Sequence, residues 1–330
     1  MFVRAPRYRI ARVGLAALAW SFCLLAAVFA QGFPAGPIRI VVPTAPGTPP
    51  DIISRIIAQE LSDAEGWRVV VENRPGATMT IGATEVIKQA ADGQTIFAMS
   101  VPISAAPALL QNMPFKLNED FTPIIKVSTS YNVLVVHPDV PAKSVPELVA
   151  HLKSHPDKLN FSSGGFGTPA HLIGEMFKQQ TGVRTVHVPY QQFPQAIADL
   201  LNGTSQYMFI TTLPVVDLVA SGKLRALAVT GPKRLASMPN IPTIVEQGFA
   251  GLAVEDWVGL AVKSGTPDDI VLRLNGAINK ALAKPSVGMA FAKLGAEPAG
   301  GTPAAFRELL SAQIEHWAKV VTEAGIKNRP

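Results

Sequence analysis

Two short loops carry residues that could bind an anion, and each places a Thr-Pro step at the expected start of a helix. The first is Gly47-Thr48-Pro49-Pro50-Asp51, and the second is Ser162-Ser163-Gly164-Gly165-Phe166-Gly167-Thr168-Pro169. Backbone N–H groups at a helix start have no partner within the helix, and the helix dipole is positive there. Such a start attracts phosphates and carboxylates. The two loops therefore predict the two halves of one anion-binding cleft.

The first loop predicts a well-capped helix with few donors to offer. Thr48 and Asp51 stand three residues apart, as in a capping box. The Thr48 hydroxyl would accept from the amide at the third helical position, and Asp51 would accept from the Thr48 amide. Pro49 fits the first helical position, but Pro50 removes a second amide donor. A purely structural cap and a direct ligand contact both remain open for this loop.

The second loop is richer in donors. Ser162 and Ser163 offer hydroxyls, the glycines let a backbone approach a ligand closely, and the amides of Ala170 and His171 lie in the first helical turn. No lysine follows the glycines as in a Walker A loop, and the G-x-G-x-x-G spacing is absent. The loop therefore favours a carboxylate over a nucleotide phosphate. A plain strand-to-helix turn is the alternative.

The histidines raise the question of a metal site. His151 and His155 have the i, i+4 spacing of a metal-binding pair, but Pro156 ends their helix and no glutamate lies between them. A solvated helix face is the favoured interpretation. His137 and His187 stand beside prolines at expected strand ends and are interpreted as structural. We therefore predict no metal and no cofactor.

A hydrolase is the competing function. His171 and Asp51 could be combined with Ser162 or Ser163 as a hydrolytic set. The chain contains no G-x-S-x-G nucleophile elbow, and His171 is more simply a residue at a helix start. We therefore predict no catalytic residues and keep a secreted hydrolase as the less favoured alternative.

The first 30 residues have the pattern of a secretory signal. Arginines within positions 4–12 precede an apolar run over 13–29, and Val28-Phe29-Ala30 offers small or aliphatic residues where a signal peptidase reads. Cleavage after Ala30 would export a soluble protein to the periplasm. An uncleaved anchor is disfavoured because the run is short for a membrane span. A lipid anchor on Cys23 is disfavoured because Phe22 precedes it.

Loss of the signal changes the composition. The chain has 29 Lys plus Arg and 24 Asp plus Glu, and the signal takes four arginines and no acid, so the mature chain has a net charge of +1. This near neutrality predicts neither nucleic acid nor a membrane surface as a partner. Cys23, the only cysteine, is also lost, so no disulfide can form. Such a chain depends on large packed cores, which favours two lobes.

Apolar strand patterns alternate with helical patterns along the mature chain. The first series has expected strands at 38–42, 69–71 and 95–99, with helices at 51–61 and 81–90. After an irregular segment at 111–123, a second series has strands at 133–136, 159–161, 186–188 and 224–229, with helices at 146–152, 169–179 and 195–201. After the segment 257–262 the chain ends in helices, most clearly at 270–282 and 303–324. This order predicts an α/β fold with mainly parallel strands.

A series of short motifs runs in order along nearly the whole mature chain. They include Pro37-Ile38-Arg39-Ile40-Val41-Val42-Pro43, Glu72-Asn73-Arg74-Pro75-Gly76-Ala77, Asp120-Phe121-Thr122-Pro123, His171-Leu172 with Gly174-Glu175, His187-Val188-Pro189-Tyr190, Gly222-Lys223-Leu224-Arg225-Ala226-Leu227-Ala228-Val229 and Ile241-Pro242-Thr243. In this order the motifs resemble the Bug-type solute-binding proteins that serve tripartite tricarboxylate transporters. No single motif carries the resemblance, but the ordered series does.

The resemblance implies a two-lobed, type II-like periplasmic binding protein, in which each lobe is a mixed, mainly parallel sheet flanked by helices. Lobe 1 would comprise 31–130 plus 255–330, lobe 2 would comprise 131–254, and the ligand cleft would lie between them. A monomer would deliver a small organic acid to membrane permease subunits, holding the carboxylate by amides, hydroxyls and waters. The matching ligand positions are Thr44, Ala45, Thr48 and Asp51 in lobe 1 and Ser162, Ser163, Thr168, Ala170, His171, Pro189, Tyr190 and Gln191 in lobe 2.

Four departures from the family pattern lie near the expected cleft. Thr48-Pro49 and Thr78-Met79 replace glycines, Gln191-Gln192 replaces Lys-Gly, and Ile210 replaces an aspartate. Each change removes a glycine or a charge. We therefore expect bulkier, more apolar walls, suited to an aromatic or longer-chain carboxylate rather than citrate or an amino acid. A ligand-sensing adaptor for a signalling partner needs the same closing lobes and is the alternative to transport.

Overall fold

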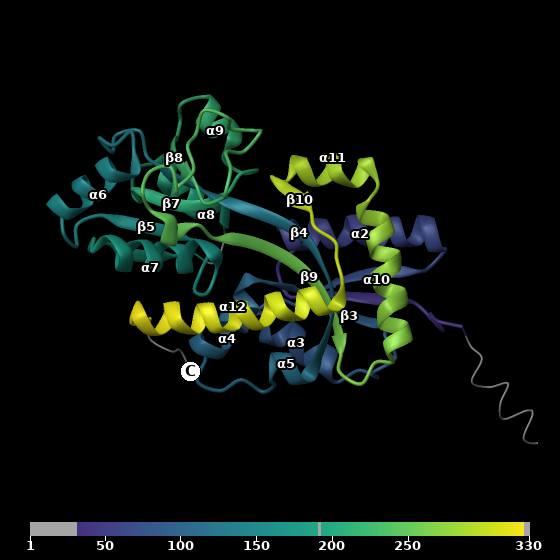
Figure 1. Cartoon of the computed structure of the whole chain (residues 1–330). Coiled ribbons are helices and arrows are strands. Elements are labelled where there is room, and N and C mark those ends of the chain that lie inside the picture. Colours follow the sequence, from purple (N-terminus) through teal and green to yellow (C-terminus); the bar gives the residue numbers. More distant parts are fainter. Residues whose placement is uncertain (1–31, 191–192, 327–330) are drawn as a thin grey trace, which may run out of the picture.

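The computed structural model describes residues 32–190 and 193–326, and the strands of this part form one continuous sheet system (Figure 1). The predicted signal at 1–30 and the predicted ligand residue Gln191 lie outside these ranges. The strands are β1 (Ile38–Val42), β2 (Val69–Asn73), β3 (Thr95–Ser100), β4 (Phe121–Val136), β5 (Asn160–Ser163), β6 (Val186–Pro189), β7 (Tyr207–Thr211), β8 (Arg225–Val229), β9 (Glu255–Lys263) and β10 (Ala296–Pro298).

Strand β4 links two parts of this sheet system. In the first part, β2, β1 and β3 run parallel, β9 pairs antiparallel with β3, and β4 pairs antiparallel with β9. The pairing of β4 with β9 ends at Tyr131, and its pairing with β7 begins at Asn132. In the second part, β5 runs parallel to both β6 and β7. One strand of 16 residues therefore contributes to both parts.

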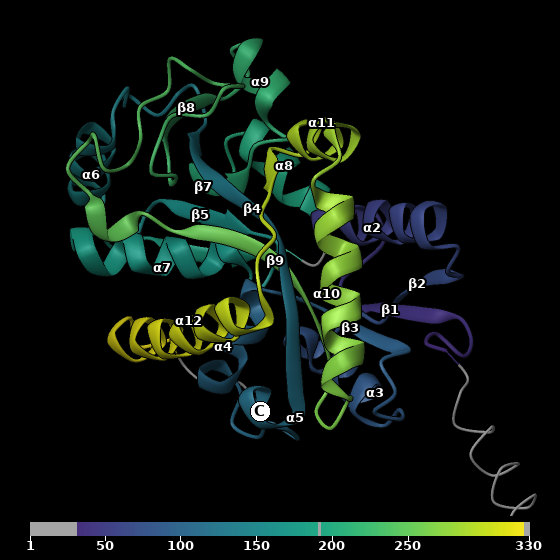
Figure 2. The same cartoon turned by 45° about the vertical axis from the view of Figure 1, so that its right-hand side comes forward.

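Helices cover both parts of the sheet (Figure 2). Those that follow or flank the first part are α2 (Pro49–Glu65), α3 (Thr80–Ile87), α4 (Val101–Leu109), α5 (Leu117–Asp120), α10 (Asp268–Leu282), α11 (Pro285–Lys293) and α12 (Pro303–Glu323). Those of the second part are α6 (Val145–Ser154), α7 (Pro169–Thr181), α8 (Phe193–Leu201) and α9 (Val216–Ala220), and the 3-10 helices are η1 (Ala77–Met79) and η2 (Ala250–Leu252). No helix of the described ranges is both long enough and apolar enough to cross a bilayer.

Three apolar cores hold the sheet and helices together. One joins β1 to α2 and α10 through residues such as Ile40, Ile57 and Leu274. Another extends from the first part into the second and includes Phe97 and Phe177. A third lies under α8. Burying one such side chain stabilises the fold by about 1.5–3 kcal/mol, so these cores can support a chain that has no disulfide.

The structure confirms most of the expected elements and corrects others. The segment 111–123 was expected to be irregular, but β4 begins at Phe121. The pairing of β4 with β9 shifts register between Pro123 and Ile125, and this bulge accommodates a proline that cannot donate to the ladder. Helix α4 was not predicted because Pro107 lies inside it. The elements α5, α9, α11, β7 and β10 were also not predicted.

Asp256 lies on β9 opposite Ser130, close to the point where β4 passes between the two parts. Burial raises the pKa of the Asp256 carboxyl to about 7, although its oxygen accepts a hydrogen bond from the Trp257 N–H at 2.9 Å. In the unfolded chain the carboxyl titrates near 3.8. Between these values the folded state holds a proton that the unfolded state has lost. Stability therefore decreases as pH rises through this window.

We expect Asp256→Asn to remove this pH dependence and to stabilise the protein at pH 8 by about 1–3 kcal/mol. Asparagine is neutral at every pH, and its side-chain oxygen can still accept from the Trp257 amide. Urea unfolding at a series of pH values between 4.5 and 8 measures the effect. Asp139→Asn is the control, because the Asp139 side chain is 93% exposed. A variant with the same slope as the wild type would contradict the expectation.

Candidate functional site

The first loop connects β1 to α2, and the side chains of Thr44 and Thr48 are hydrogen-bonded within it. Their hydroxyl oxygens lie 2.7 Å apart, and the Thr48 hydroxyl donates to the Ala45 carbonyl at 2.8 Å. The predicted capping box is wrong: no amide donates to the Thr48 side chain, and Asp51 accepts from the Gly47 amide at 2.9 Å instead of from the Thr48 amide. Since Pro50 lacks an N–H, only one of the usual capping amides remains, and the Thr48 hydroxyl turns to a carbonyl.

Asp51 is the buried centre of the first loop. Its carboxylate accepts hydrogen bonds from Arg55, from the Gly47 amide and from Asn73, and Asn73 also donates to the Thr44 carbonyl at 3.0 Å. Burial favours the protonated form, but the hydrogen bonds from Arg55, Gly47 and Asn73 outweigh it, so the pKa of Asp51 is lowered. Asp51 therefore ties the loop to α2 and β2 as a charged group.

The second loop connects β5 to α7 and is closed by its own hydroxyls. Ser163 accepts from the Gly165 amide at 3.1 Å, and Thr168 donates to the Gly165 carbonyl at 2.7 Å. Gly165 and Gly167 have φ angles of +116° and +78°, which side-chain-bearing residues rarely adopt. The Ser163 carbonyl also accepts from the Tyr190 amide at 3.0 Å, which brings the end of β6 to the loop. The sequence-predicted loop residues are therefore assembled in one place.

The other predicted ligand residues of this half differ in burial and in the hydrogen bonds that they already make. Ser162 is fully buried, and its hydroxyl has no hydrogen-bond partner among the described residues. The Tyr190 hydroxyl donates to Asp199 at 2.5 Å, and burial together with that carboxylate raises the pKa of Tyr190 to about 12. Ala170 is buried in the first turn of α7, and Pro189 is exposed at the end of β6. The Tyr190 hydroxyl therefore has its proton committed to Asp199 and can only accept from another group.

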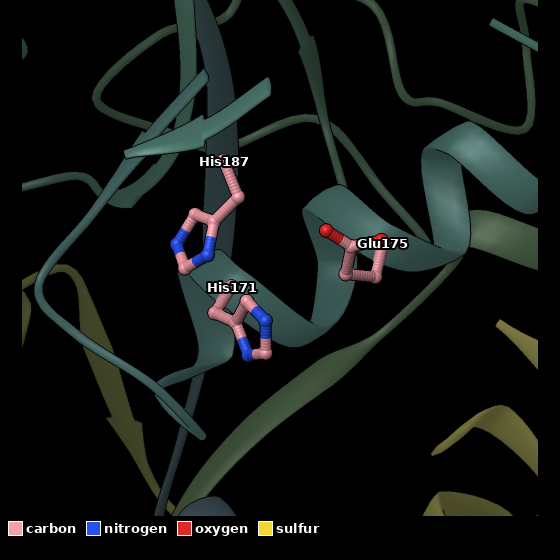
Figure 3. Close-up of side chains that lie close together, drawn as sticks. All are labelled: His171, Glu175 and His187. Atoms are coloured by element: carbon pink, nitrogen blue, oxygen red, sulfur yellow. The ribbon is translucent and has the colours of Figure 1, made fainter. Parts of the chain in front are cut away.

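His187 is a functional candidate that sequence reasoning set aside as structural. Its Nε2 lies 2.7 Å from the Ser163 hydroxyl, and its ring stacks on that of His171 with the centroids 4.3 Å apart. His171 Nδ1 accepts from the Gly167 amide at 3.1 Å. The two rings thus lie against each other (Figure 3), and each contacts a residue of the second loop. The motif His187-Val188-Pro189-Tyr190 was noticed in the sequence, but its contact with α7 depends on the packing of β6.

Glu175 lies one helical turn after His171, and ligand atoms of His171, Glu175 and His187 all fall within 4.8 Å of one another. Both carboxylate oxygens of Glu175 accept from Lys178, at 3.0 and 2.9 Å. The planes of the two imidazoles are only 30° apart, so their in-plane lone pairs run side by side instead of converging on one ion. Bound zinc needs donors that converge at about 2.0–2.2 Å. The arrangement fits a hydrogen-bonded packing cluster better than a metal site.

The two halves of the site meet at Gly167. A Cβ on this glycine would lie 3.1 Å from Cγ2 of Thr78 and 3.1 Å from Cδ1 of Leu109. Thr78 belongs to η1, in which Ala77, Thr78 and Met79 have consecutive φ angles of +44°, +49° and +72°. A left-handed backbone costs about 1–2 kcal/mol for each such residue. Strain of this kind is characteristic of functional sites, and here it lies where the second loop contacts the first half.

The positions at which this sequence departs from the family pattern lie in different parts of the structure. Thr78 lies at the contact with Gly167, whereas Met79 is buried beside Ser100. Ile210 is 1% exposed and packs in the core under α8. It therefore contributes to packing and not to a wall. The loop segments 43–51 and 162–171 contain no lysine or arginine, so an anion there would be held by neutral donors.

Comparison with known proteins gives a consistent result. The model of the family described as the tripartite tricarboxylate transporter family receptor matches residues 53–326. Protein BugT of Bordetella pertussis is 35% identical over 306 residues, which cover 92% of this chain and 94% of BugT. These matches confirm the resemblance that the ordered motifs predicted.

Solved structures agree with the sequence matches. The periplasmic binding protein BugD is 32% identical, and its structure matches with a TM-score of 0.80 over 90% of this chain and 100% of the BugD chain. The R. palustris protein Rpa4515, solved with adipate, is also 32% identical, with a TM-score of 0.82 over 90% of this chain and 100% of its own. The α/β periplasmic binding protein fold expected from the sequence is thereby confirmed.

Proposed function

Because this chain belongs to the tripartite tricarboxylate transporter receptor family, we propose that it binds a small carboxylate between its two loops and passes it to the membrane subunits of such a transporter. The family consists of solute-binding proteins, so the chain is a binding protein and not an enzyme. The contact of the second loop at Gly167 with Thr78 and Leu109 carries the proposal, because it brings a donor-rich helix start of one half against the other half.

The ligand chemistry follows from the groups around that contact. The loops offer hydroxyls and amides without a lysine or arginine, and the Arg55 guanidinium beside the first loop is engaged by Asp51 at 3.0 Å. The half-buried side chains of Thr78 and Pro49 supply methyl and methylene surface. A related protein was solved with adipate, a linear dicarboxylate. These features support a longer-chain or aromatic acid as the ligand of this protein, in preference to citrate or an amino acid.

The proposed lobes comprise 31–130 plus 255–330 and 131–254. The change of β4 partner between Tyr131 and Asn132 supports the first boundary, and the pairing of Tyr131 with Glu255 at the start of β9 supports the second. The proposed location is the periplasm, supported by the signal pattern at 1–30 and by the likeness to a periplasmic binding protein. As a delivery protein of this kind, it would act as a monomer.

Isothermal calorimetry on the mature protein, residues 31–330, tests the proposal with adipate, benzoate, malate, citrate and aspartate. We expect micromolar or tighter binding of adipate or benzoate, weaker binding of citrate and aspartate, and none of the neutral analogue adipamide. Native mass spectrometry of protein purified without refolding provides a second measurement, since a retained acid would appear as a mass difference. Tight citrate binding with none of adipate or benzoate would contradict the ligand class. Failure of every acid would contradict the function.

A further inference from the structure

We propose that His171 and His187 are positioning residues that hold the second loop in its ligand-binding shape, and that protonation of this pair releases both the loop and the ligand. The inference rests on the proposed function in one respect, because it takes the second loop as the carboxylate anchor. The histidines themselves act through the loop, and neither needs to touch the ligand.

Four aromatic rings form a column beneath the loop. Phe161 stacks on His187 with centroids 4.7 Å apart, His187 stacks on His171 at 4.3 Å, and His171 packs on Phe166 at 4.8 Å. These residues come from β5, β6, α7 and the loop itself. The column therefore joins the loop to two strands and a helix, and the two imidazoles form its centre.

Each imidazole is linked to one of the two left-handed glycines. The Gly167 amide donates to His171 Nδ1 at 3.1 Å. His187 Nε2 lies 2.7 Å from the Ser163 hydroxyl, and that hydroxyl contacts both the amide and the carbonyl of Gly165 at 3.1 Å. Glycine loses more conformational freedom on folding than any other residue. Without these two links, the glycines would have many backbone conformations available besides the one that aims the α7 start at a ligand.

A proton on this pair opposes the arrangement. Nδ1 of His171 can accept from the Gly167 amide only in the unprotonated state, because the imidazolium has an N–H at both ring positions. Two imidazoliums with centroids 4.3 Å apart would also repel each other. Histidine is the side chain whose charge changes between pH 5 and 8. Acid should therefore turn the acceptor for Gly167 into a donor and loosen the loop.

The surrounding groups leave this effect intact. On α7 the pair faces Glu175, whose carboxylate is already matched by the Lys178 ammonium at 2.9 Å. Tyr207 on β7 stacks on Phe161, which in turn stacks on His187; burial raises the pKa of Tyr207, and its hydroxyl lies 2.8 Å from Thr185. From the first half, the loop meets the uncharged Thr78 and Leu109. The Glu175 carboxylate and the Lys178 ammonium of this surrounding carry opposite charges.

The test uses variants that keep the hydrogen bonds but cannot take up a proton. In His171→Asn the side-chain oxygen can replace Nδ1 as the acceptor for Gly167, and in His187→Gln the amide group can replace Nε2 beside Ser163. Adipate affinity of the wild type is expected to fall at least about tenfold more between pH 7.5 and 5.5 than that of the H171N/H187Q variant. The titration of adipate itself is common to both proteins and cancels in this comparison.

Amide hydrogen exchange of the peptide covering 162–169 provides a ligand-free measurement. The exchange rates are corrected for the pH dependence of intrinsic amide exchange. After this correction, the peptide should lose its protection at pH 5.5 in the wild type and keep it in H171N/H187Q. His171→Ala should lose protection and binding at every pH, and H151N/H155Q, on α6, should behave as the wild type. Circular dichroism checks that each variant is folded.

The outcomes separate the two proposals. Equal loss of adipate affinity and of loop protection in the wild type and in H171N/H187Q would overturn the positioning role. If the protein binds a carboxylic acid but the protection of its second loop does not change with pH, the positioning role is also overturned, while the proposed function stands. Protection that depends on pH as expected, in a protein that binds none of the acids, would support the positioning role and contradict the proposed function.

Discussion

Gly167→Ala is expected to weaken acid binding at least about tenfold. The new Cβ would lie 3.1 Å from both Thr78 Cγ2 and Leu109 Cδ1, closer than atoms of this kind normally approach. Leu109 is fully buried, and Thr78 belongs to the strained η1 turn, so neither can move aside easily. Overpacking of this kind costs about 1–3 kcal/mol, and 1.4 kcal/mol is a factor of ten in affinity.

Gly182→Ala is the matched control for this experiment. Gly182 ends the same helix, α7, with a φ of +68°, but a Cβ there would meet nothing within 4 Å. Both variants should lose about 1 kcal/mol of folding stability through the left-handed backbone. Only Gly167→Ala should lose affinity in calorimetry. Equal affinities for the two variants would show that the contact of the loop with Thr78 plays no part in binding.

Asp51→Ala is expected to reduce the free energy of unfolding by about 2–4 kcal/mol and to weaken acid binding. The substitution leaves the Gly47 amide, Asn73 and Arg55 without their shared acceptor. The Asp51 side chain is 3% exposed whereas that of Arg55 is 50% exposed, so Arg55 can turn to water and limits the loss. Because Asn73 also bonds the Thr44 carbonyl, the shape of the first loop should change with the stability.

Urea unfolding at different pH values measures how much of the stability comes from the negative charge of Asp51. The pKa of Asp51 is lowered in the folded protein, so its contribution is fully present above the unfolded value of 3.8 and is lost as pH falls through the folded value. The stability difference between wild type and Asp51→Ala should therefore shrink in acid. Glu119→Ala is the control, since its ion pair with Lys116 is exposed on both sides. A difference that persists unchanged at low pH would contradict this account.

Local patterns in the sequence predicted most of the elements that carry the site. The apolar run at 38–42 is β1, and the Thr-Pro steps at Thr48 and Thr168 do begin α2 and α7. These features depend on neighbouring residues, so periodicity and proline placement suffice to identify them. The length of β4 was missed because Pro123 argues against a strand until its bulge with β9 is known.

The hydrogen bonds of the site were harder to predict because they join distant elements. His187 was assigned a structural role because it stands near a proline at an expected strand end, yet it contacts both Ser163 and His171 after β6 pairs with β5. Asn73 was not among the predicted site residues, although it connects Asp51 to the Thr44 carbonyl. A carboxamide placed at the end of a parallel strand next to β1 was the signal that could have found it.

The position of β9 between β3 and β4 bears on when this protein can fold. Strand β3 ends at Ser100 and pairs with a strand that begins at Glu255, so about 150 residues are synthesised between the two partners. Until then, the apolar edge of β3 has no partner, and loops of this length close slowly. The N-terminal part of the sheet therefore cannot be completed before about four-fifths of the chain has left the ribosome. The first part of the sheet therefore stays incomplete for most of translation, whereas all strands of the second part have been synthesised by Val229.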